Sequence, residues 1–164
     1  MTKTDGVRLK PATIEWQDGT PFCNEFDDVY YRSEQPFTEY GLKETEYLFL
    51  QQNQLRERWE NLSAQQDPSH SVFVIGETGF GTGLNFLTAC DLWLKTAPKH
   101  WRLQFISTEI RPISLSDIQE IHQGWSVFSE LSKQLLDQYP ILTPGVHLVE
   151  LAEGRIQLLL LLGE

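Results

Sequence analysis

The chain has 164 residues, of which 40% are hydrophobic and 12% aromatic, and its formal net charge is −10. This length and composition allow one folded domain with a hydrophobic core and exclude an intrinsically disordered chain. An acidic chain has no general electrostatic attraction to nucleic acid or to an anionic membrane, so binding to either needs a local basic patch or another part of the protein.

Signals for export, membrane insertion and metal binding are not found in the sequence. Cys23 and Cys90 lie far apart and outside any C-x-x-C pair, which predicts two reduced thiols in a cytoplasmic protein. The histidines are scattered without ligand spacing, so no metal site is expected. The N-terminus lacks the apolar segment of a signal peptide, and the longest apolar run, Ile156 to Leu162, is too short to span a bilayer.

Residues 1–70 are predicted to form a small extension. Asp18 and Gly19 make a typical hairpin turn between two β-rich segments, which predicts an N-terminal β element outside the main sheet. Further elements are expected as a loop over Ser33–Tyr40, a helix over Leu42–Trp59 and a polar connector over Asn61–Ser71.

Residues 71–164 alternate between strand and helix patterns. Val72–Ile75 is a continuous apolar run, which is typical of a parallel strand covered on both faces. Ser114 and Asp117 have the spacing of a capping box that opens a helix. The alternation, with short turns, predicts an α/β domain with a doubly wound sheet. The expected strands are Val72–Ile75, Leu103–Ser107, Val146–Leu151 and Arg155–Leu162, and the expected helices are Leu84–Lys95 and the segment from Ser114 to Pro140.

A glycine-rich turn joins the first of these strands to the helix that begins at Leu84. Gly79, Gly81 and Gly83 alternate with other residues, a pattern that allows positive φ and close approach of the backbone to a ligand. The helix N-terminus that follows suits a carboxylate or a phosphate. A dinucleotide fingerprint would need glycine at Leu84 or Phe86, and no lysine follows as in a P-loop.

The remaining pattern is acid-x-Gly-x-Gly-x-Gly, which begins at Glu77 and is similar to motif I of class I S-adenosylmethionine methyltransferases. In that family the loop wraps the methionine half of the cofactor, and the acidic residue helps to orient it. The alternative is a tight turn in which the glycines serve only backbone sterics.

Two further carboxylates end predicted strands. Glu109 follows Leu103–Ser107, where a carboxylate can accept hydrogen bonds from both ribose hydroxyls; the alternative is a solvated acid. Glu164 stands where methyltransferases often place an acidic residue near the adenine. No catalytic residue is predicted. The predicted cofactor-binding residues are Glu77, Thr78, Gly79, Phe80, Gly81, Gly83, Asn85, Glu109 and Glu164.

Several segments beyond the glycine-rich motif carry a more specific resemblance, which extends from about Pro11 to Glu164. The chain resembles the N-terminal methyltransferase domain of the bifunctional bacterial enzyme that makes 5-methylaminomethyl-2-thiouridine in tRNA. One departure is Gln51-Gln52-Asn53, where the family has a Gly-Gly-Asn turn. The segments that carry the resemblance are Phe26–Tyr31, Gly41–Leu50, Asn53–Leu55, Glu77–Thr88 and Phe105–Glu109.

The resemblance implies methyl transfer from S-adenosylmethionine to the amine of 5-aminomethyl-2-thiouridine at the tRNA wobble position. It also implies that residues 71–164 are the first half of a Rossmann-like class I methyltransferase domain whose sheet is incomplete at its C-terminal half. In the family a further strand with an Asp-Gly-Phe-x-Pro motif follows and, in the long form, an FAD-dependent oxidoreductase domain. These 164 residues alone are therefore expected to be inactive, with tRNA contacts mostly outside them.

Other interpretations stay open. The chain could be a class I methyltransferase acting on a small molecule or a protein, or a truncated, inactive fragment that binds cofactor. Four aromatic residues are interpreted as core or hairpin packing in preference to a pocket for stacking nucleobases. They are Trp16, Tyr30, Tyr31 and Trp59.

Overall fold

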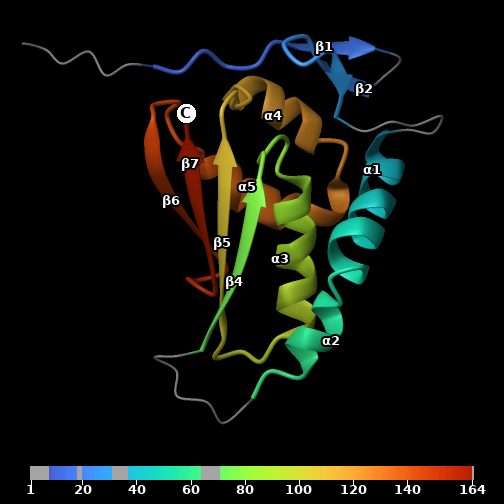
Figure 1. The fold of residues 1–164 in the computed structure, drawn as a ribbon, viewed down its shortest axis with the longest axis vertical. Coiled ribbons are helices and arrows are strands. Elements are labelled where there is room, and N and C mark those ends of the chain that lie inside the picture. Colours follow the sequence, from blue (N-terminus) through green and yellow to red (C-terminus); the bar gives the residue numbers. More distant parts are fainter. Residues whose placement is uncertain (1–7, 18–19, 31–36, 64–70, 164) are drawn as a thin grey trace, which may run out of the picture.

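The structure is a computed structural model that describes residues 8–17, 20–30, 37–63 and 71–163 (Figure 1). These residues form a three-stranded antiparallel sheet near the N-terminus, a four-stranded mixed sheet, and helices packed against the larger sheet. No described helix combines the length and the hydropathy needed to cross a membrane.

The small sheet consists of β1 (Ile14–Gln17), β2 (Thr20–Cys23) and β3 (Asp28–Val29), each antiparallel to the next. Gln17 pairs with Thr20, which leaves a two-residue connection, although its residues Asp18 and Gly19 lie outside the described part of the chain. The small sheet is separate from the larger one, so the predicted N-terminal β element is confirmed.

The segment from Leu42 to Trp59 is not the single helix that the sequence predicts. A break lies at Gln54, whose φ of 53° places it in the left-handed region. A helix cannot continue through this conformation, and an L-residue adopts it at an energetic cost. The three parts of the segment are α1 (Phe37–Thr45), the π-helix η1 (Glu46–Gln51) and α2 (Leu55–Glu60).

The loop predicted over Ser33–Tyr40 is wrong in its second half, because α1 begins at Phe37. Pro36, which lies within the predicted loop, directly precedes this start in the sequence. Proline is well tolerated at the beginning of a helix, because the N–H that it lacks would have no intrahelical partner there. Residues 33–36 themselves lie outside the described part of the chain.

The large sheet has the strand order β4-β5-β7-β6. Its first three strands in this order are parallel, and β6 is antiparallel to β7, to which a tight turn joins it. The α/β class is therefore confirmed with a mixed, mostly parallel sheet. The strands are β4 (Val72–Thr78), β5 (Arg102–Glu109), β6 (Gly145–Leu151) and β7 (Ile156–Leu162).

Helices cover one face of the large sheet within the described residues. They contact one another as a layer, α3 with α1, α2 and α5, and α5 with α4 (Figure 1). The predicted helical segment from Ser114 to Pro140 contains two separate α-helices with a short 3-10 helix between them, and Ser114 is the N-cap of the first, as predicted. The helices of this part are α3 (Leu84–Thr96), α4 (Leu115–His122), the short 3-10 helix η3 (Ser126–Phe128) and α5 (Ser129–Asp137).

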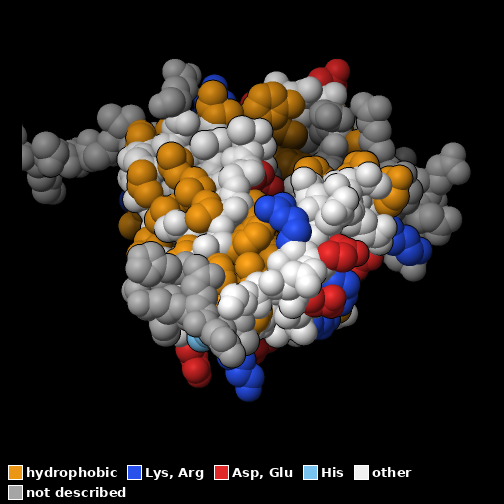
Figure 2. All heavy atoms as spheres, turned by 60° about the horizontal axis from the view of Figure 1, so that its bottom comes forward, with side chains coloured by type: hydrophobic (Ala, Val, Ile, Leu, Met, Phe, Trp, Pro, Cys, Tyr) orange, Lys and Arg blue, Asp and Glu red, His pale blue; other side chains and the backbone are white. Residues whose placement is uncertain are grey.

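The other face of the sheet carries apolar side chains that no described element covers. Val74, Val146 and Leu148 are 54%, 64% and 57% exposed, and hydrophobic side chains gather on the side of β6 and β7 in Figure 2. A doubly wound sheet has helices on both faces, so the described residues differ from that prediction and supply only one helical layer.

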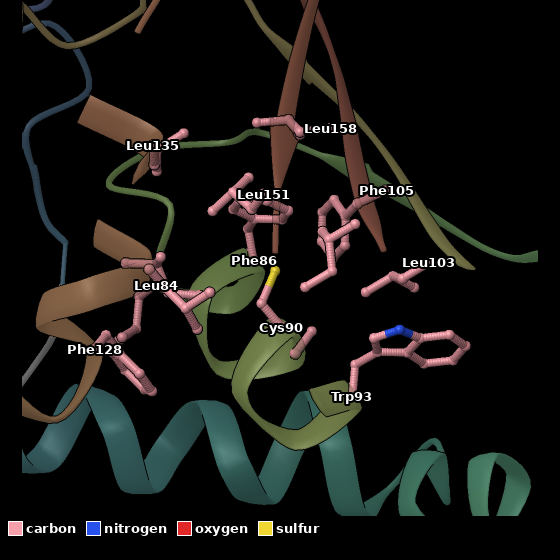
Figure 3. Packing of buried hydrophobic residues seen from close by; sticks show 14 of the residues in the cluster. Leu84, Phe86, Cys90, Trp93, Leu103, Phe105, Phe128, Leu135, Leu151 and Leu158 are labelled. Atoms are coloured by element: carbon pink, nitrogen blue, oxygen red, sulfur yellow. The ribbon is translucent and has the colours of Figure 1, made fainter. Parts of the chain in front are cut away.

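The core lies between α3 and the covered face of the sheet. Phe86, Cys90 and Trp93 of α3 point toward Leu103 and Phe105 of β5 (Figure 3). Phe86 and Phe105 pack edge to face, with ring centroids 5.2 Å apart.

Residues of the N-terminal extension belong to the same core. Trp59 is fully buried and packs edge to face on Trp93 and Phe73, at centroid distances of 5.2 and 5.8 Å. The interpretation of Trp59 as a core residue is therefore confirmed. The division of the chain into residues 1–70 and 71–164 stays a prediction.

Candidate functional site

The glycine-rich loop connects the end of β4 to the start of α3. Gly79, Gly81 and Gly83 all have positive φ values, of 82°, 53° and 78°. A Cβ atom at Gly83 would lie 2.9 Å from Cζ of the buried Phe80 ring, and one at Gly81 would lie 3.5 Å from the Tyr30 ring. The positive φ favours glycine at all three positions, and at Gly83 a side chain would also clash with the Phe80 ring.

Backbone amides dock this loop onto the end of β5. The N–H groups of Gly79 and Phe80 both donate to the carbonyl oxygen of Thr108, at 2.9 and 3.0 Å. The N–H of Gly81 donates to Oε2 of Glu109 at 2.9 Å. The loop and the carboxylate predicted to bind ribose are thus joined directly.

Glu109 is the last residue of β5 and is 9% exposed. Besides the bond from Gly81, its Oε1 accepts from the N–H of Arg111 at 2.7 Å. A carboxylate can accept about four hydrogen bonds, so Glu109 retains acceptor capacity for a ligand. The N–H of Gly163 donates to the Glu109 carbonyl at 3.0 Å, while Glu164, predicted near the adenine, lies outside the described residues.

Glu77 is a second carboxylate at the loop, near the end of β4. Its Oε1 accepts from Nδ2 of Asn85 at 2.9 Å, and its Oε2 accepts from the hydroxyl of Ser107 at 2.7 Å. The Thr45 hydroxyl donates to Oδ1 of Asn85 at 3.1 Å, which directs the amide nitrogen toward Glu77. Burial raises the pKa of the Glu77 carboxyl, and the bonds from Ser107 and Asn85 oppose this rise.

Two cavities meet at Gly79, which lines both. One has a volume of about 600 Å³ and includes Glu77, Thr78 and Asn85 in its wall. The other has a volume of about 400 Å³ and includes Glu109. Gly79 thus lies in the walls of both spaces, and each wall includes one carboxylate.

A buried histidine is bonded to the same loop. His122, the last residue of α4, lies with Nε2 2.8 Å from the carbonyl oxygen of Thr82 and with Nδ1 2.7 Å from the Ser132 hydroxyl. Burial lowers the pKa of His122, and the bond to Thr82 opposes this effect. No pattern in the sequence predicts these two contacts, because His122 is one of several histidines without ligand spacing.

We expect protonation of His122 to lower the stability of the protein in acid. Its pKa in the folded state lies below the ordinary value of 6.5, so below pH 6.5 the unfolded chain binds a proton more readily than the folded one. The free energy of unfolding should therefore fall as the pH decreases from 6.5 to the lowered pKa, by at most about 1.4 kcal/mol per pH unit, and then level off.

Urea unfolding of the wild type and of His122→Gln at a series of pH values measures this effect. Glu77, whose raised pKa acts in the opposite direction, is present in both proteins and cancels in the difference. A difference between the two proteins that stays constant below pH 6.5 would contradict the assignment.

The remaining predicted residues have varied surroundings. The Phe80 ring is buried against Phe86, at a centroid distance of 6.1 Å, so only its backbone faces the loop surface. Trp16 on β1 is 40% exposed, and Tyr30 is half-buried beside Gly81. Tyr31 lies outside the described residues. Within the described ranges, no group of three or more His, Cys, Asp or Glu side chains is placed to hold a metal ion.

Comparison with known proteins gives relatives over almost the whole chain. It is 39% identical over 158 residues to the tRNA 5-methylaminomethyl-2-thiouridine biosynthesis bifunctional protein MnmC of Legionella pneumophila strain Lens, a match that covers 96% of this chain and 22% of the relative. It is 44% identical over 158 residues to the protein of the same name from Marinomonas, with the same two coverages. No protein-family model matches the chain.

One solved structure shows the same fold. A crystal structure described as MNMC2 from Aquifex aeolicus matches with a TM-score of 0.61 and 19% sequence identity, over 99% of this chain and 44% of that chain. At this identity the match concerns the fold alone. The chain spans about a fifth of the length of the curated relatives, and it is homologous to the N-terminal region of the bacterial bifunctional MnmC proteins.

Proposed function

We propose that this chain binds S-adenosylmethionine across its glycine-rich loop and forms the cofactor-binding part of a class I methyltransferase that modifies tRNA. The observation that carries this proposal is the pair of adjacent cavities at Gly79, with Glu77 in the wall of one and Glu109 in the wall of the other. An extended cofactor with polar groups at both ends suits such a pair of spaces.

The chemistry of the residues fits the two halves of the cofactor. The methionine half carries an ammonium group, for which the Glu77 carboxylate is a matching acceptor, and a carboxylate, for which the first N–H groups of α3 are matching donors. A bound ammonium would offset the rise in the pKa of Glu77 that burial causes. Glu109 is a matching acceptor for the ribose hydroxyls.

The bound cofactor supplies an electrophilic methyl group on a sulfonium. The residues on the cofactor side of the site hold that methyl group in place and keep water away from it. No described residue is assigned as a catalytic acid or base. FAD belongs, on this proposal, only to the oxidoreductase region of the longer relatives.

The proposed substrate is the primary amine of 5-aminomethyl-2-thiouridine in tRNA. The support is the name of the relatives, which are tRNA 5-methylaminomethyl-2-thiouridine biosynthesis proteins. The net charge of −10 gives this chain no general attraction to tRNA, so we assign most tRNA contacts to regions outside it. We also infer a reducing, cytoplasmic location, which the two buried free cysteines support.

A full-length chimeric protein that contains this chain tests the proposed function. The homologous segment of the Marinomonas relative is replaced by these 164 residues, and the chimera is incubated with radiolabelled S-adenosylmethionine and tRNA that carries 5-aminomethyl-2-thiouridine. We expect label on the wobble uridine, and none when the inserted segment carries Gly81→Val.

The outcome that contradicts the proposal is a folded chimera that binds S-adenosylhomocysteine but transfers no methyl group to this tRNA. Transfer of label to an added small molecule or protein, and not to this tRNA, would assign a different substrate. A chimera that does not fold is recognised by circular dichroism, and in that case cofactor binding by the chain itself decides the first half of the proposal.

A further inference from the structure

His122 contacts the glycine-rich loop but neither of the two cavities. It is 5% exposed, and it is absent from the residues that line the spaces around Glu77 and Glu109. Its bonding partner Thr82 lies between Gly81 and Gly83 and is 2% exposed. The contact therefore lies beneath the loop surface that faces the proposed ligand.

The Thr82 carbonyl and the Ser132 hydroxyl of α5 together fix the tautomer of the His122 ring. The carbonyl oxygen of Thr82 can only accept a hydrogen bond, so Nε2 of His122 carries the hydrogen and donates it. In the neutral ring Nδ1 then accepts, and the Ser132 hydroxyl donates to it at 2.7 Å. Ser132 is itself 5% exposed, so water does not readily replace either bond.

The bond from His122 holds one end of a peptide unit whose other end is also held. The Thr82 carbonyl accepts from His122, and the N–H of Gly83 in the same peptide donates to the Phe80 carbonyl at 2.9 Å. Glycines on either side of Thr82 would otherwise allow the loop many conformations. The Thr82–Gly83 peptide leads directly into α3, so its orientation sets where the first N–H groups of that helix point.

We propose that His122 is a positioning residue for cofactor binding, which touches no ligand and holds the Thr82–Gly83 peptide in the conformation that receives S-adenosylmethionine. This inference rests on the proposed function. The apparent affinity of a ligand falls in proportion to the fraction of protein in the binding-competent conformation. Loss of the His122 bond lowers that fraction.

Three variants of the protein separate positioning from a general contribution to stability. His122→Leu removes the ring N–H that bonds to the Thr82 carbonyl, whereas His122→Gln keeps an N–H donor at a similar reach. Leu135→Ala, in the fully buried part of α5, destabilises the same pair of helices without touching the loop bond.

Calorimetric titration with S-adenosylhomocysteine, at a temperature where all variants are folded, gives the readout. We expect about 10- to 100-fold weaker binding for His122→Leu, and binding within about threefold of the wild type for His122→Gln and Leu135→Ala. Equal affinities for His122→Leu and Leu135→Ala at equal stability would overturn the proposal.

Absence of S-adenosylhomocysteine binding by the wild type would count against the proposed function. In that case two other measurements still test whether His122 holds the loop. Nitrogen NMR of the wild-type imidazole should show the neutral ring with hydrogen on Nε2. Hydrogen exchange of the Gly81 and Gly83 amides reports on the loop directly. In His122→Gln the exchange rate should be less than threefold above that of the wild type. In His122→Leu the exchange rate should be much higher than in Leu135→Ala. The opposite tautomer, or equal exchange in the last two variants, would show that His122 does not hold the loop.

Discussion

Gly81→Val should abolish measurable binding of S-adenosylhomocysteine while leaving the helix and strand content unchanged. At a φ of 53° a β-branched residue is strongly disfavoured, with a strain of about 1–3 kcal/mol. Its Cβ would be in contact with the Tyr30 ring at 3.5 Å, and the valine methyl groups would add bulk beside the cavity that Tyr30, Gly81 and Glu109 line. Relief of the strain would also pull the Gly81 N–H away from Glu109. Together these effects predict an affinity at least about a hundredfold lower.

Gly154→Val is the matched control. Gly154 has a φ of 81° in the turn between β6 and β7, and no atom lies within 4 Å of its added Cβ. The substitution therefore imposes similar backbone strain away from the loop. Calorimetry should show near wild-type affinity for Gly154→Val and none for Gly81→Val. Wild-type affinity in both variants would mean that the loop glycines serve only the turn.

Glu109→Ala should weaken binding of S-adenosylhomocysteine about 10- to 100-fold. Hydrogen bonds to a charged group contribute roughly 1.5–3 kcal/mol, and this substitution removes the proposed bonds to ribose. It also leaves the N–H groups of Gly81 and Arg111 without their acceptor. Glu109→Gln should have an intermediate effect, because its single carbonyl oxygen replaces only one of the two carboxylate oxygens.

The control for this prediction is Glu120→Ala, which makes the same change in net charge on an exposed part of α4. Calorimetry at equal ionic strength should give the wild-type affinity for this variant. An equal loss of affinity in Glu109→Ala and Glu120→Ala would attribute the effect to overall charge. No loss in either variant would place the ribose elsewhere.

Much of the large sheet was predictable because its signals are local. The strand patterns of β4, β5 and β7 and the glycine-rich turn into α3 each lie within a few residues of sequence, and the structure has these elements there. In this chain neither glycine nor proline marks the break at Gln54, because Gln51 and Gln52 stand where the family that it resembles has the glycines of a turn. The apolar run of β4 predicted cover on both faces, whereas the described helices cover one.

In the proposed site, too, some features depend on neighbouring residues in the sequence and others on residues far apart in it. Positive φ at the three loop glycines and the place of Glu109 at the end of a strand follow from local spacing. Thr45, Ser107 and His122 act through partners 30 or 40 residues away in the chain, and one sequence alone carries no signal for such contacts. The alternation along β5 places Ser107 on the same face as Leu103 and Phe105, but it does not identify Glu77 as its partner.

The central claim is that the pair of cavities at Gly79 binds S-adenosylmethionine and not a nicotinamide dinucleotide. Parallel calorimetric titrations of the unmodified protein with S-adenosylhomocysteine and with NADH test it most directly. We predict saturable binding of one S-adenosylhomocysteine per chain, lost in Gly81→Val, and no heat of binding with NADH. Tight binding of NADH, with no binding of S-adenosylhomocysteine, would contradict the account.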